Sequence, residues 1–254
     1  MTDSSTWITN LQDLESNNLK LKNINSSIGC NLRNGCVRIE NTLFSVGKDA
    51  IYAWSADTDE LNECNAYSIS EPIKHLLNKN FFHNCLVHLN YTDREIWFFN
   101  FEQNCTWIYN YTRKLWYSFS GFSPSTFLDG GDQVRFVEDS YVYVFDKSLF
   151  YDKKSINNNR AIVATLKSGE LEFNSNHKKK LSSTTVRGEC NSGNITLRIT
   201  LDSKKTLMYD ITPKKSHSVN IFRTKTGSFK TLYFTLIASG AGVQTIHGIE
   251  LDAN

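Results

Sequence analysis

Most of the chain consists of short segments in which apolar and polar residues alternate. Alternation of this kind places successive side chains on opposite faces of a β-strand. The segments are rich in β-branched and aromatic residues, and polar turns separate them. In the first part of the chain the predicted strands are 37–40, 43–46, 51–54, 85–89, 95–99, 107–111, 114–119, 134–137 and 141–145. The pattern predicts an all-β fold of mostly antiparallel sheets, with less than about a tenth of the residues in helices.

Only two segments have helical character. Residues 71–78 have Pro72 early and Asn78 at the end, an arrangement that suits a short helix. The polar stretch at the beginning contains one weakly amphipathic segment around Trp7 and Leu11, which fits either a short helix or an arm that docks on a neighbour. We therefore expect an N-terminal arm over residues 1–22.

Three of the predicted hairpins resemble one another. Residues 43–54, 86–99 and 134–145 each combine a strand, a tight acidic turn and an aromatic strand. Their starts are about 45 residues apart, which is the spacing of β-propeller blades. A blade is a four-stranded antiparallel sheet that buries its faces against its neighbours. The spacing is equally compatible with an ordinary β-sandwich that contains repeated hairpins, and both interpretations remain open.

The composition changes near Asn158. Beyond this point aromatic residues become sparse, and Lys, Thr and Ser become more frequent. Alternating segments at 161–166, 183–189, 195–201, 231–237 and 246–251 are separated by turn signals. At least five such strands in about 95 residues predict a compact β-sandwich. The expected organisation is an arm (1–22), a partial or reduced propeller-like domain (23–157) and a small β-sandwich (158–254).

Charge and cysteine content narrow the function classes. The formal net charge is +2. From Ala161 onward 13 Lys and Arg face 7 Asp and Glu, a balance of +6, and the remainder balances at −4. This excess is too weak to predict a nucleic-acid binder.

The six Cys form no C-x-x-C pair, and we interpret them as buried small hydrophobes in a reducing compartment rather than as disulfides. No secretory signal is evident, and no apolar run approaches the ~20 residues of a membrane span.

No catalytic motif stands out. The sequence contains no G-x-S-x-G, P-loop or H-E-x-x-H pattern. Asp129 and Asp132 flank two glycines and could serve glycoside hydrolysis or Ca²⁺ binding, but a turn between strands explains them more simply. His75, His83 and His88 are close in sequence, yet they span a predicted helix, a loop and a strand, which disfavours a metal site. We therefore predict no catalytic, cofactor-binding or metal-ligating residue and no enzymatic activity.

Three further features have a structural and a functional interpretation. The Lys178–Lys180 run fits a solvated loop, or a contact to DNA phosphate or an acidic neighbour. Gly240-Ala241-Gly242 fits a hairpin turn, because no phosphate-binding fingerprint accompanies it. The aromatic set could form a sugar-stacking platform, but we favour core packing. Its members are Trp97, Phe98, Phe99, Trp107, Tyr109, Tyr111, Trp116 and Tyr117.

A resemblance to a known family rests on the order of several short motifs. An Ile-Gly-Cys turn ends at Cys30, and a hairpin over 37–52 ends in Ala50-Ile51-Tyr52, where the family usually has Gly in place of Ala50. The chain resembles phage tail proteins of the nozzle or hub kind, also called stabilisation proteins. Further matching segments are 69–73, 95–98, 107–116, 164–173, 229–236 and 246–251. The matching positions relate to folding, and none of them carries chemistry.

The resemblance implies a structural component of a bacteriophage tail. Such a protein, made in the host cytoplasm and built into the virion, forms part of the DNA-ejection conduit or its attachment platform. The implied partners are other tail proteins (nozzle, adaptor or fibre) and further copies of the chain. The copies would form a ring of sixfold symmetry. DNA would pass through this ring without sequence-specific binding. A carbohydrate- or receptor-binding β module of a phage tail is the alternative.

The number of blades leads to a prediction about interfaces. Family members are often longer and hold a complete propeller, whereas this chain has about three blade-like units. A partial propeller exposes sheet edges and aromatic faces, which proteins rarely leave open. We expect the first domain to be buried against copies of itself or a distinct tail protein, over more than ~2,000 Å². Trp54, Trp97, Trp107 and Trp116 should then be covered by the next blade or by that partner.

Overall fold

The fold was analysed in a computed structural model of the chain. The structure describes residues 1, 5–8, 21–30, 32–55, 65–128, 132–146, 151–155, 158–172, 177–190, 193–211, 218–223, 226–240 and 244–253. Every strand pair in this part of the chain is antiparallel. Helix is confined there to two short 3₁₀ segments. The predicted all-β fold is confirmed.

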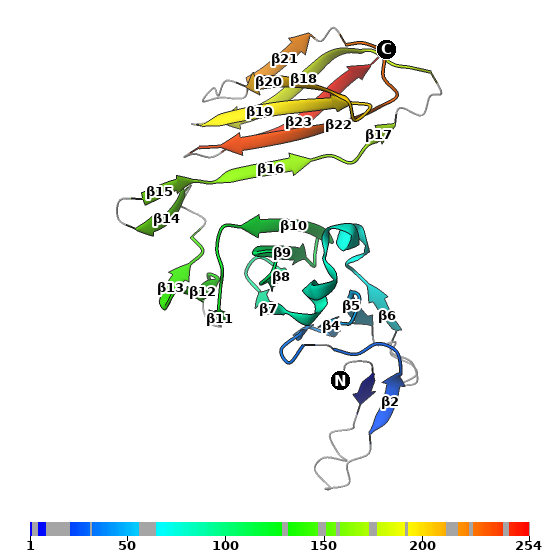
Figure 1. The fold of residues 1–254 in the computed structure, drawn as a ribbon, viewed down its shortest axis with the longest axis vertical. Helices are drawn as coiled ribbons and strands as arrows, with labels where there is room; N and C mark the ends of the chain where they lie inside the picture. The colour runs from blue at the N-terminus through cyan, green and yellow to red at the C-terminus, as the bar shows by residue number, and fades with distance from the viewer. Residues whose placement is uncertain are drawn as a thin grey trace. The chain divides into compact units, whose positions relative to one another are not determined.

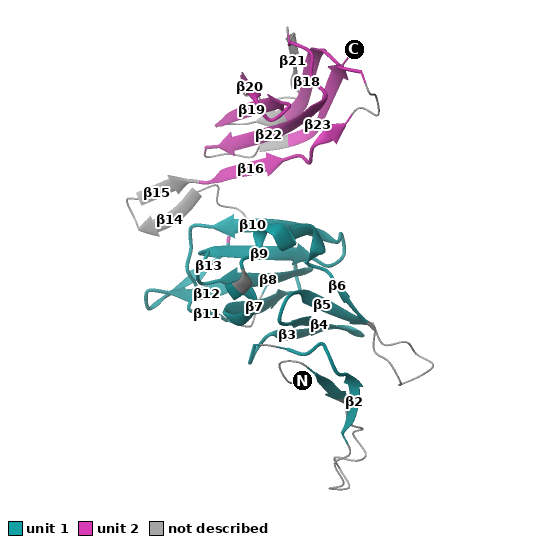
Figure 2. Ribbon diagram, turned by 45° about the vertical axis from the view of Figure 1, so that its right-hand side comes forward, with its two compact units in different colours: residues 1–145 teal, residues 146–254 magenta. Residues whose placement is uncertain are grey.

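The chain divides into two compact units, Met1–Phe145 (unit 1) and Asp146–Asn254 (unit 2) (Figure 2). Composition placed the change of character at Asn158, which is the first residue of β15 (Asn158–Ala161). This strand pairs with β14 (Tyr151–Ser155) in a two-stranded hairpin. The β14–β15 hairpin thus lies at the junction between the end of unit 1 at Phe145 and the change of composition at Asn158.

Unit 1 contains three sheets whose strands follow one another in chain order (Figure 1). Sheet I consists of β3 (Cys36–Ile39), β4 (Thr42–Val46), β5 (Ile51–Ser55) and β6 (Asn65–Ser68). Sheet II consists of β7 (Cys85–Asn90), β8 (Glu95–Asn100), β9 (Cys105–Asn110) and β10 (Leu115–Ser120). Sheet III has three strands, β11 (Thr126–Leu128), β12 (Arg135–Glu138) and β13 (Tyr141–Val144). A separate hairpin pairs β1 (Thr6–Ile8) with β2 (Lys22–Asn25).

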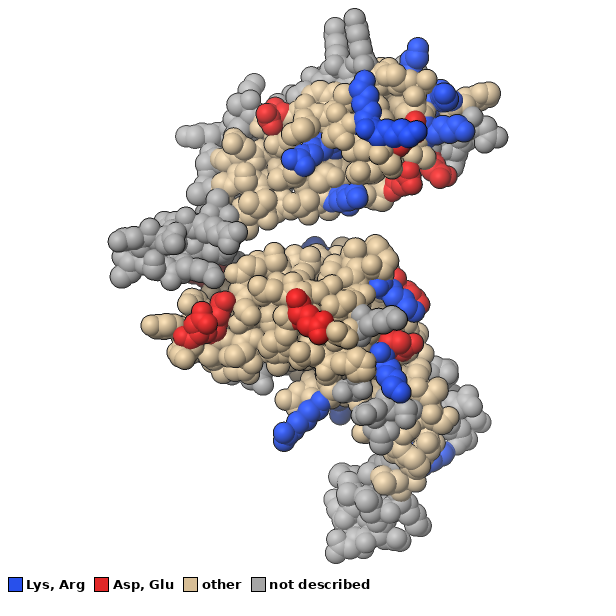
Figure 3. Space-filling view, viewed as in Figure 1, with Lys and Arg blue, Asp and Glu red and all other residues tan. Residues whose placement is uncertain are grey.

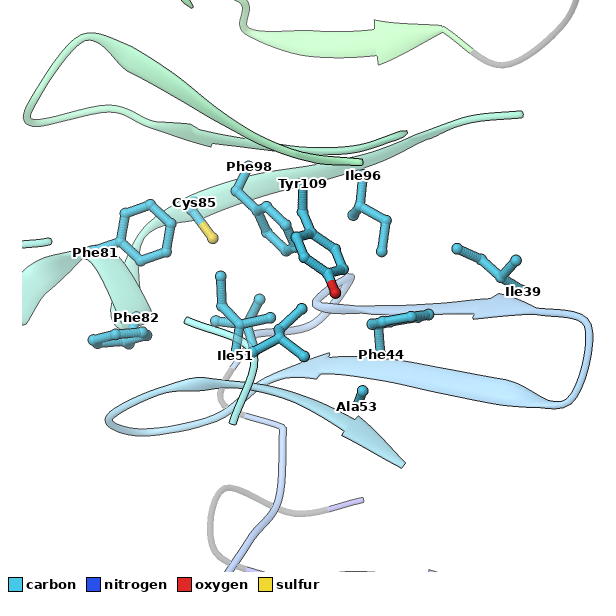
Figure 4. Packing of buried hydrophobic residues seen from close by; sticks show 12 residues of the cluster. Ile39, Phe44, Ile51, Ala53, Phe81, Phe82, Cys85, Ile96, Phe98 and Tyr109 are labelled. Carbon is cyan, nitrogen blue, oxygen red and sulfur yellow. The ribbon is translucent and has the colours of Figure 1, made fainter. Parts of the chain in front are cut away.

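Strand β8 of sheet II is buried on both faces, because sheet I packs against one face and sheet III against the other. Ile96 and Phe98 of β8 belong to a core cluster that also contains Phe44 of sheet I (Figure 4). The intervening Trp97 belongs to a second cluster, together with Phe136 of sheet III. A strand covered on both sides has no solvent face, which explains why β8 reads as an unbroken apolar run rather than an alternating one. Sheets I, II and III therefore form a stack.

The turns of sheet II repeat every ten residues. β7, β8 and β9 end at Asn90, Asn100 and Asn110, and a four-residue turn follows each of them. The side-chain oxygen of Asn100 accepts a hydrogen bond from the backbone N–H of Gln103 at 2.7 Å, and Asn90 and Asn110 accept the equivalent bonds at 3.4 and 2.9 Å. The last residue of each turn has a left-handed backbone, with φ of 60°, 46° and 54° at Arg94, Asn104 and Lys114. These local bonds shape each hairpin.

The repeated hairpins recognised in the sequence occupy unequal places in the sheets. Residues 43–54 form the second and third strands of sheet I, and 134–145 cover the second and third of sheet III. Residues 86–99 instead form the first and second strands of sheet II. The middle copy is therefore one strand out of register. Short aromatic strands with polar turns look alike in sequence, and only the pairing distinguishes them.

The predicted short helix over 71–78 is present as the 3₁₀ helix η1 (Glu71–Leu76), with Pro72 in its first turn and Ile73 buried. A second 3₁₀ helix, η2 (Lys79–His83), follows directly and was not predicted. It brings Phe81 and Phe82 into the core between sheets I and II. The two helices thus close one end of that core.

Unit 2 is built from two sheets around one core. One sheet has the order β16-β22-β19-β20, and β17 also pairs with β22. The other has the order β21-β18-β23. Their core is aliphatic, with Leu197 and Ile199 of β19 fully buried and Val186 of β18 facing the same cluster. The strands are β16 (Val163–Lys167), β17 (Leu171–Glu172), β18 (Leu181–Cys190), β19 (Asn194–Leu201), β20 (Lys205–Ile211), β21 (Ser218–Arg223), β22 (Thr231–Ser239) and β23 (Gln244–Ala253).

Candidate functional site

A cleft in unit 1 runs along the first strands of the three stacked sheets. β3 and β11 each lie beside β7, so the opening strand of every sheet contributes to one side of the unit. The cleft has a volume of about 610 Å³ and is lined by parts of β3, β7 and β11 and by the residues beside them.

The polar groups of this cleft are few and mixed. Arg38 lines it and donates from Nε to the backbone oxygen of Glu40 at 2.9 Å. His88 is buried on β7, and its ring stacks on Phe127 of β11 with 4.9 Å between centroids. Among the described residues that line the cleft, Arg38 is the only Lys, Arg, Asp or Glu.

Two thiols meet at the edge of the cleft. Cys30 is half-buried, and its thiol is hydrogen-bonded to that of Cys36, an exposed residue that begins β3 and lines the cleft. The hydrogen bond from Cys36 is the largest cause that lowers the pKa of Cys30, to about 6, and backbone hydrogen bonds around Leu32 add to it against the effect of burial. The same bond and burial raise the pKa of Cys36. Sequence reasoning missed this pair.

The other two thiols in the described part of the chain differ in burial. Cys85 is buried on β7, and burial raises its pKa to about 12. Cys105 is half-buried on β9, and burial raises its pKa as well. The interpretation of the cysteines as buried hydrophobes therefore holds for Cys85 but is wrong for Cys36, which is exposed. Cys64 lies outside the described residues, and nothing is described of the Cys190 side chain.

The three histidines considered for a metal site do not form one in the described residues. His75 is exposed on η1 and His83 is exposed on η2, whereas His88 is buried on β7. No group of three or more His, Cys, Asp or Glu residues that could hold a metal ion occurs within the part of the chain that the structure describes.

The carboxylates flanking the two glycines are only partly placed. Asp129, Gly130 and Gly131 lie outside the described residues, and Asp132 is exposed ahead of β12. The interpretation of this segment as a turn between strands therefore stays a prediction. Gly240 has a φ of +126°, and a Cβ there would approach the Cα of Gly193 to 2.5 Å, so this turn requires glycine. Gly242 is outside the described residues.

The aromatic set lies mostly in the core. Trp97, Phe98, Phe99 and Tyr109 are buried, and Trp107, Tyr111 and Trp116 are partly buried. Trp116 donates from Nε1 to the backbone oxygen of Ile69 at 2.9 Å, which fixes its ring against sheet I. Trp54 is buried as well, and its Nε1 donates to Ser45 Oγ at 2.8 Å. This packing agrees with the core interpretation of the set.

Sheet II nevertheless exposes one apolar row on its last strand. Leu115, Tyr117 and Phe119 of β10 lie on one face and are 57, 36 and 38% exposed. The Tyr117 hydroxyl donates to Glu95, and burial followed by this bond raises the pKa of Tyr117. Phe119 stacks on Phe145 with 5.6 Å between ring centroids. The row therefore approaches the end of sheet III.

Sheet III is the second place where apolar side chains are exposed. Val142 and Val144 of β13 are 60 and 46% exposed, on the face opposite to buried Phe136. Tyr141, at the start of the same strand, is 68% exposed. In the described residues β13 pairs with β12 alone, so sheet III ends one strand earlier than sheets I and II. We call β13 and its exposed valines the sheet III flank.

Lysines gather at one end of unit 2. Lys178 and Lys180 are exposed, and Lys179 forms a backbone bridge with Phe229. The bridge brings this run close to Asp202, whose Oδ1 accepts from the backbone N–H of Lys230 at 2.8 Å and of Thr231 at 3.0 Å. Those backbone bonds lower the pKa of Asp202, and nearby Lys178 and Lys204 contribute. The sequence predicted the solvated run but not that it lies beside other lysines.

Comparison with known proteins gives no match to any protein-family model or any curated protein. None of the helices that the structure describes is long and apolar enough to cross a membrane.

Proposed function

We propose that this protein is a non-enzymatic structural component of a bacteriophage tail, similar to the nozzle or hub proteins of the DNA-ejection conduit. In this proposal unit 1 is a partial β-propeller whose missing blades are supplied by other chains. One observation carries the proposal: three antiparallel sheets stack in chain order, and the stack ends in a three-stranded sheet with an exposed apolar face. The resemblance of the sequence motifs to tail proteins gives the class of assembly.

The sheet III flank favours a partner over a free surface. Sheet II shows what each sheet of this stack becomes when it has two neighbours, since Ile96 and Trp97 are buried on opposite faces of one strand. Sheet III has this coverage on one side only, where Phe136 lies. Exposed apolar strands with an unpaired edge promote association with another chain. A further sheet laid on Val142 and Val144 would continue the stack.

The two units carry opposite charge, which favours a second copy as the partner. Unit 1 has 11 Lys and Arg against 17 Asp and Glu, a net charge of −6, and unit 2 has 17 against 9, a net charge of +8. In Figure 3 the visible face of unit 2 carries several Lys and Arg side chains. Contact between unit 1 of one copy and unit 2 of the next would pair opposite charges. Such head-to-tail contacts repeat, and they close into a ring where the rotation between successive copies closes; a ring is the symmetry expected of a conduit.

The oligomer tests the proposed partner. We expect purified protein at micromolar concentration to form oligomers, measured by light scattering after size exclusion, and closed rings in negative-stain images. Replacing both Val142 and Val144 by Lys should shift the mass to the monomer, because it adds charge to the sheet III flank. Met208→Lys is the matched control, since Met208 is an exposed apolar residue of β20 in unit 2. A soluble wild-type monomer would overturn the proposal that copies complete the stack.

A second experiment tests the tail assignment itself. An antiserum against the purified chain should label tails of the phage that encodes it, and disruption of the gene should give particles unable to eject DNA. Labelling of capsids alone, or normal ejection without the protein, would contradict the assignment.

The exposed row on β10 keeps the receptor-binding alternative testable. Leu115, Tyr117 and Phe119 present apolar and aromatic surface of the kind that stacks on sugar rings. A glycan array with wild-type protein and Tyr117→Ala distinguishes the two roles. Sugar binding that the substitution abolishes would favour a receptor-binding module over a conduit component.

A further inference from the structure

Cys30 and Cys36 are brought together by a tight turn rather than by chance proximity. Gly35 precedes Cys36, and its N–H donates to the backbone oxygen of Leu32 at 3.1 Å. A Cβ on Gly35 would lie 2.7 Å from Leu32 Cβ and 2.9 Å from Cys30 Sγ, so the turn can be this tight only with glycine. The oxygen of Gly35 accepts from Val46 N at 2.9 Å, which ties the turn to β4. The turn therefore holds the two sulfurs at a fixed place on sheet I.

The two thiols have different environments. In its protonated form Cys30 Sγ donates to the backbone oxygen of Leu32 at 3.2 Å, whereas the hydrogen bond from Cys36 favours the thiolate. Cys36 is exposed at the cleft, and its sulfur lies 3.5 Å from Met1 Sδ. A half-buried thiolate beside an accessible second thiol is the arrangement found in redox-sensitive cysteine pairs.

We propose that Cys30 and Cys36 form a reversible thiol–disulfide pair that hydroperoxides oxidise. The Cys30 thiolate attacks one oxygen of the peroxide; an S–O bond forms, the O–O bond breaks and hydroxide leaves, which gives a sulfenic acid. The Cys36 sulfur, after losing its proton, then attacks the Cys30 sulfur; the S–S bond forms and a second hydroxide leaves. Two electrons pass from the two thiols to hydrogen peroxide, and the products are one disulfide and two waters.

The direction of attack follows from the pKa values. A pKa of about 6 leaves Cys30 mostly as thiolate at neutral pH, whereas burial raises the pKa of Cys105. Since the thiolate is the nucleophile, Cys30 should be oxidised faster than Cys105 at pH 7.

The disulfide would change the cleft as well as the turn. Cys36 lines the cleft between β3, β7 and β11, and its oxidation removes an exposed thiol from that surface. The bond also closes the turn that joins the segment before sheet I to β3. A partner that contacts the cleft would thus meet a different surface under oxidising and reducing conditions.

Peptide mapping tests the proposal on the full chain. Arg33 lies between the two cysteines, so trypsin releases residues 23–33 and 34–38 as separate peptides. After treatment with hydrogen peroxide these two peptides should appear as one disulfide-linked species, which dithiothreitol separates. Alkylation of Cys30 by iodoacetamide should rise with pH around a midpoint near 6. Comparable oxidation rates at Cys30 and Cys105 would overturn the proposal.

Two variants give the order of the steps. Cys36→Ser should stop the reaction at the sulfenic acid on Cys30, which dimedone traps, and Cys30→Ser should abolish both products. Cys105→Ser is the matched control, because Cys105 is also half-buried but has Ser118 rather than a thiol as its side-chain partner, and it should leave the linked peptides unchanged. Dimedone labelling on Cys36 in wild-type protein, or no linked peptides in a folded sample, would contradict the pair.

Discussion

Units 1 and 2 reach an all-β core by different routes. In unit 1 each strand pairs with the strand before or after it in the chain, and its sheet strands are three to six residues long. In unit 2 the longest strands have ten residues and pair across long separations, as where Leu181 of β18 meets Ala253 of β23. Short strands offer little apolar surface for packing one sheet against another. Unit 1 compensates by stacking three sheets, whereas unit 2 needs only two.

The two cores also differ in residue type. Unit 1 packs aromatic rings between its sheets, with Phe98 and Trp116 at 5.7 Å and Phe122 and Phe136 at 5.0 Å between ring centroids. Unit 2 packs mainly Leu, Ile and Val around a single buried Phe229. Between short strands, one large aromatic ring fills the space. Between long strands, several aliphatic side chains fill it. All five tryptophans lie in unit 1, so tryptophan fluorescence reports on that unit alone.

The largest expected effect separates the stabilities of the two units. Phe98 is 1% exposed, and Phe98→Ala should destabilise unit 1 by about 3–5 kcal/mol through lost burial and a cavity. The urea midpoint seen by tryptophan fluorescence should fall, while the part of the far-UV circular dichroism transition due to unit 2 stays in place. Leu197→Ala, a fully buried position of unit 2, is the reciprocal control and should cost about 2–5 kcal/mol there. If both probes shift together for either variant, the units unfold as one.

A smaller effect tests whether the asparagine turns stabilise sheet II. Asn100 is fully buried and accepts the 2.7 Å bond from Gln103 N, so Asn100→Ala should cost about 1–2 kcal/mol. The partly buried Asn110, with a bond of 2.9 Å in the next turn, should lose less on the same substitution. Tryptophan-monitored urea unfolding measures both. Equal losses at the two positions would show that burial does not set the strength of this bond.

The smallest expected effect is a gain in the stability of unit 1. Lys114 closes the third turn with φ of +54°, a conformation that costs a lysine more than a glycine. Lys114→Gly should therefore stabilise unit 1 by about 0.5 kcal/mol, after the greater freedom of glycine in the unfolded chain is subtracted. Asn104, at φ of +46° in the previous turn, tolerates this conformation better, and Asn104→Gly should change stability less. A loss at Lys114 would mean that its side chain makes a contact that outweighs the backbone gain.

The sequence predicted the hairpins of unit 1 well, because their pairing is local. Alternation and turn residues located β4, β5, β7, β8, β12 and β13 to within about two residues. It missed several others, among them β6, β11, β20 and β21. Three residues of β11 are too few to show a period, and β20 (Lys205–Ile211) becomes a strand through its pairing with β19. The ten-residue spacing of Asn90, Asn100 and Asn110 is the sequence signal for the three equivalent turns of sheet II.

The sites were less predictable than the strands. The cleft depends on β3, β7 and β11 lying side by side, which no local pattern encodes. The thiol pair had one available signal, since Asn34-Gly35 is a turn dipeptide placed between Cys30 and Cys36. Assigning each residue to its own helix or strand was enough to place the three histidines on different elements. The same assignment was enough to predict that most of the aromatic set is buried. What sequence reasoning lacked throughout was the arrangement of distant segments.

The pairing of Leu181 with Ala253 has a consequence for how the chain folds. A hairpin of sheet II closes within about ten residues, and such local contacts form early and quickly. The β18–β23 ladder cannot form until β23 has been made, and closing the long loop between the two strands slows the folding of unit 2. During synthesis unit 1 would be complete, with Val142 and Val144 exposed, while unit 2 was still being made. If copies complete the stack as proposed, nascent chains crowded on one polysome would first meet through unit 1 during this interval.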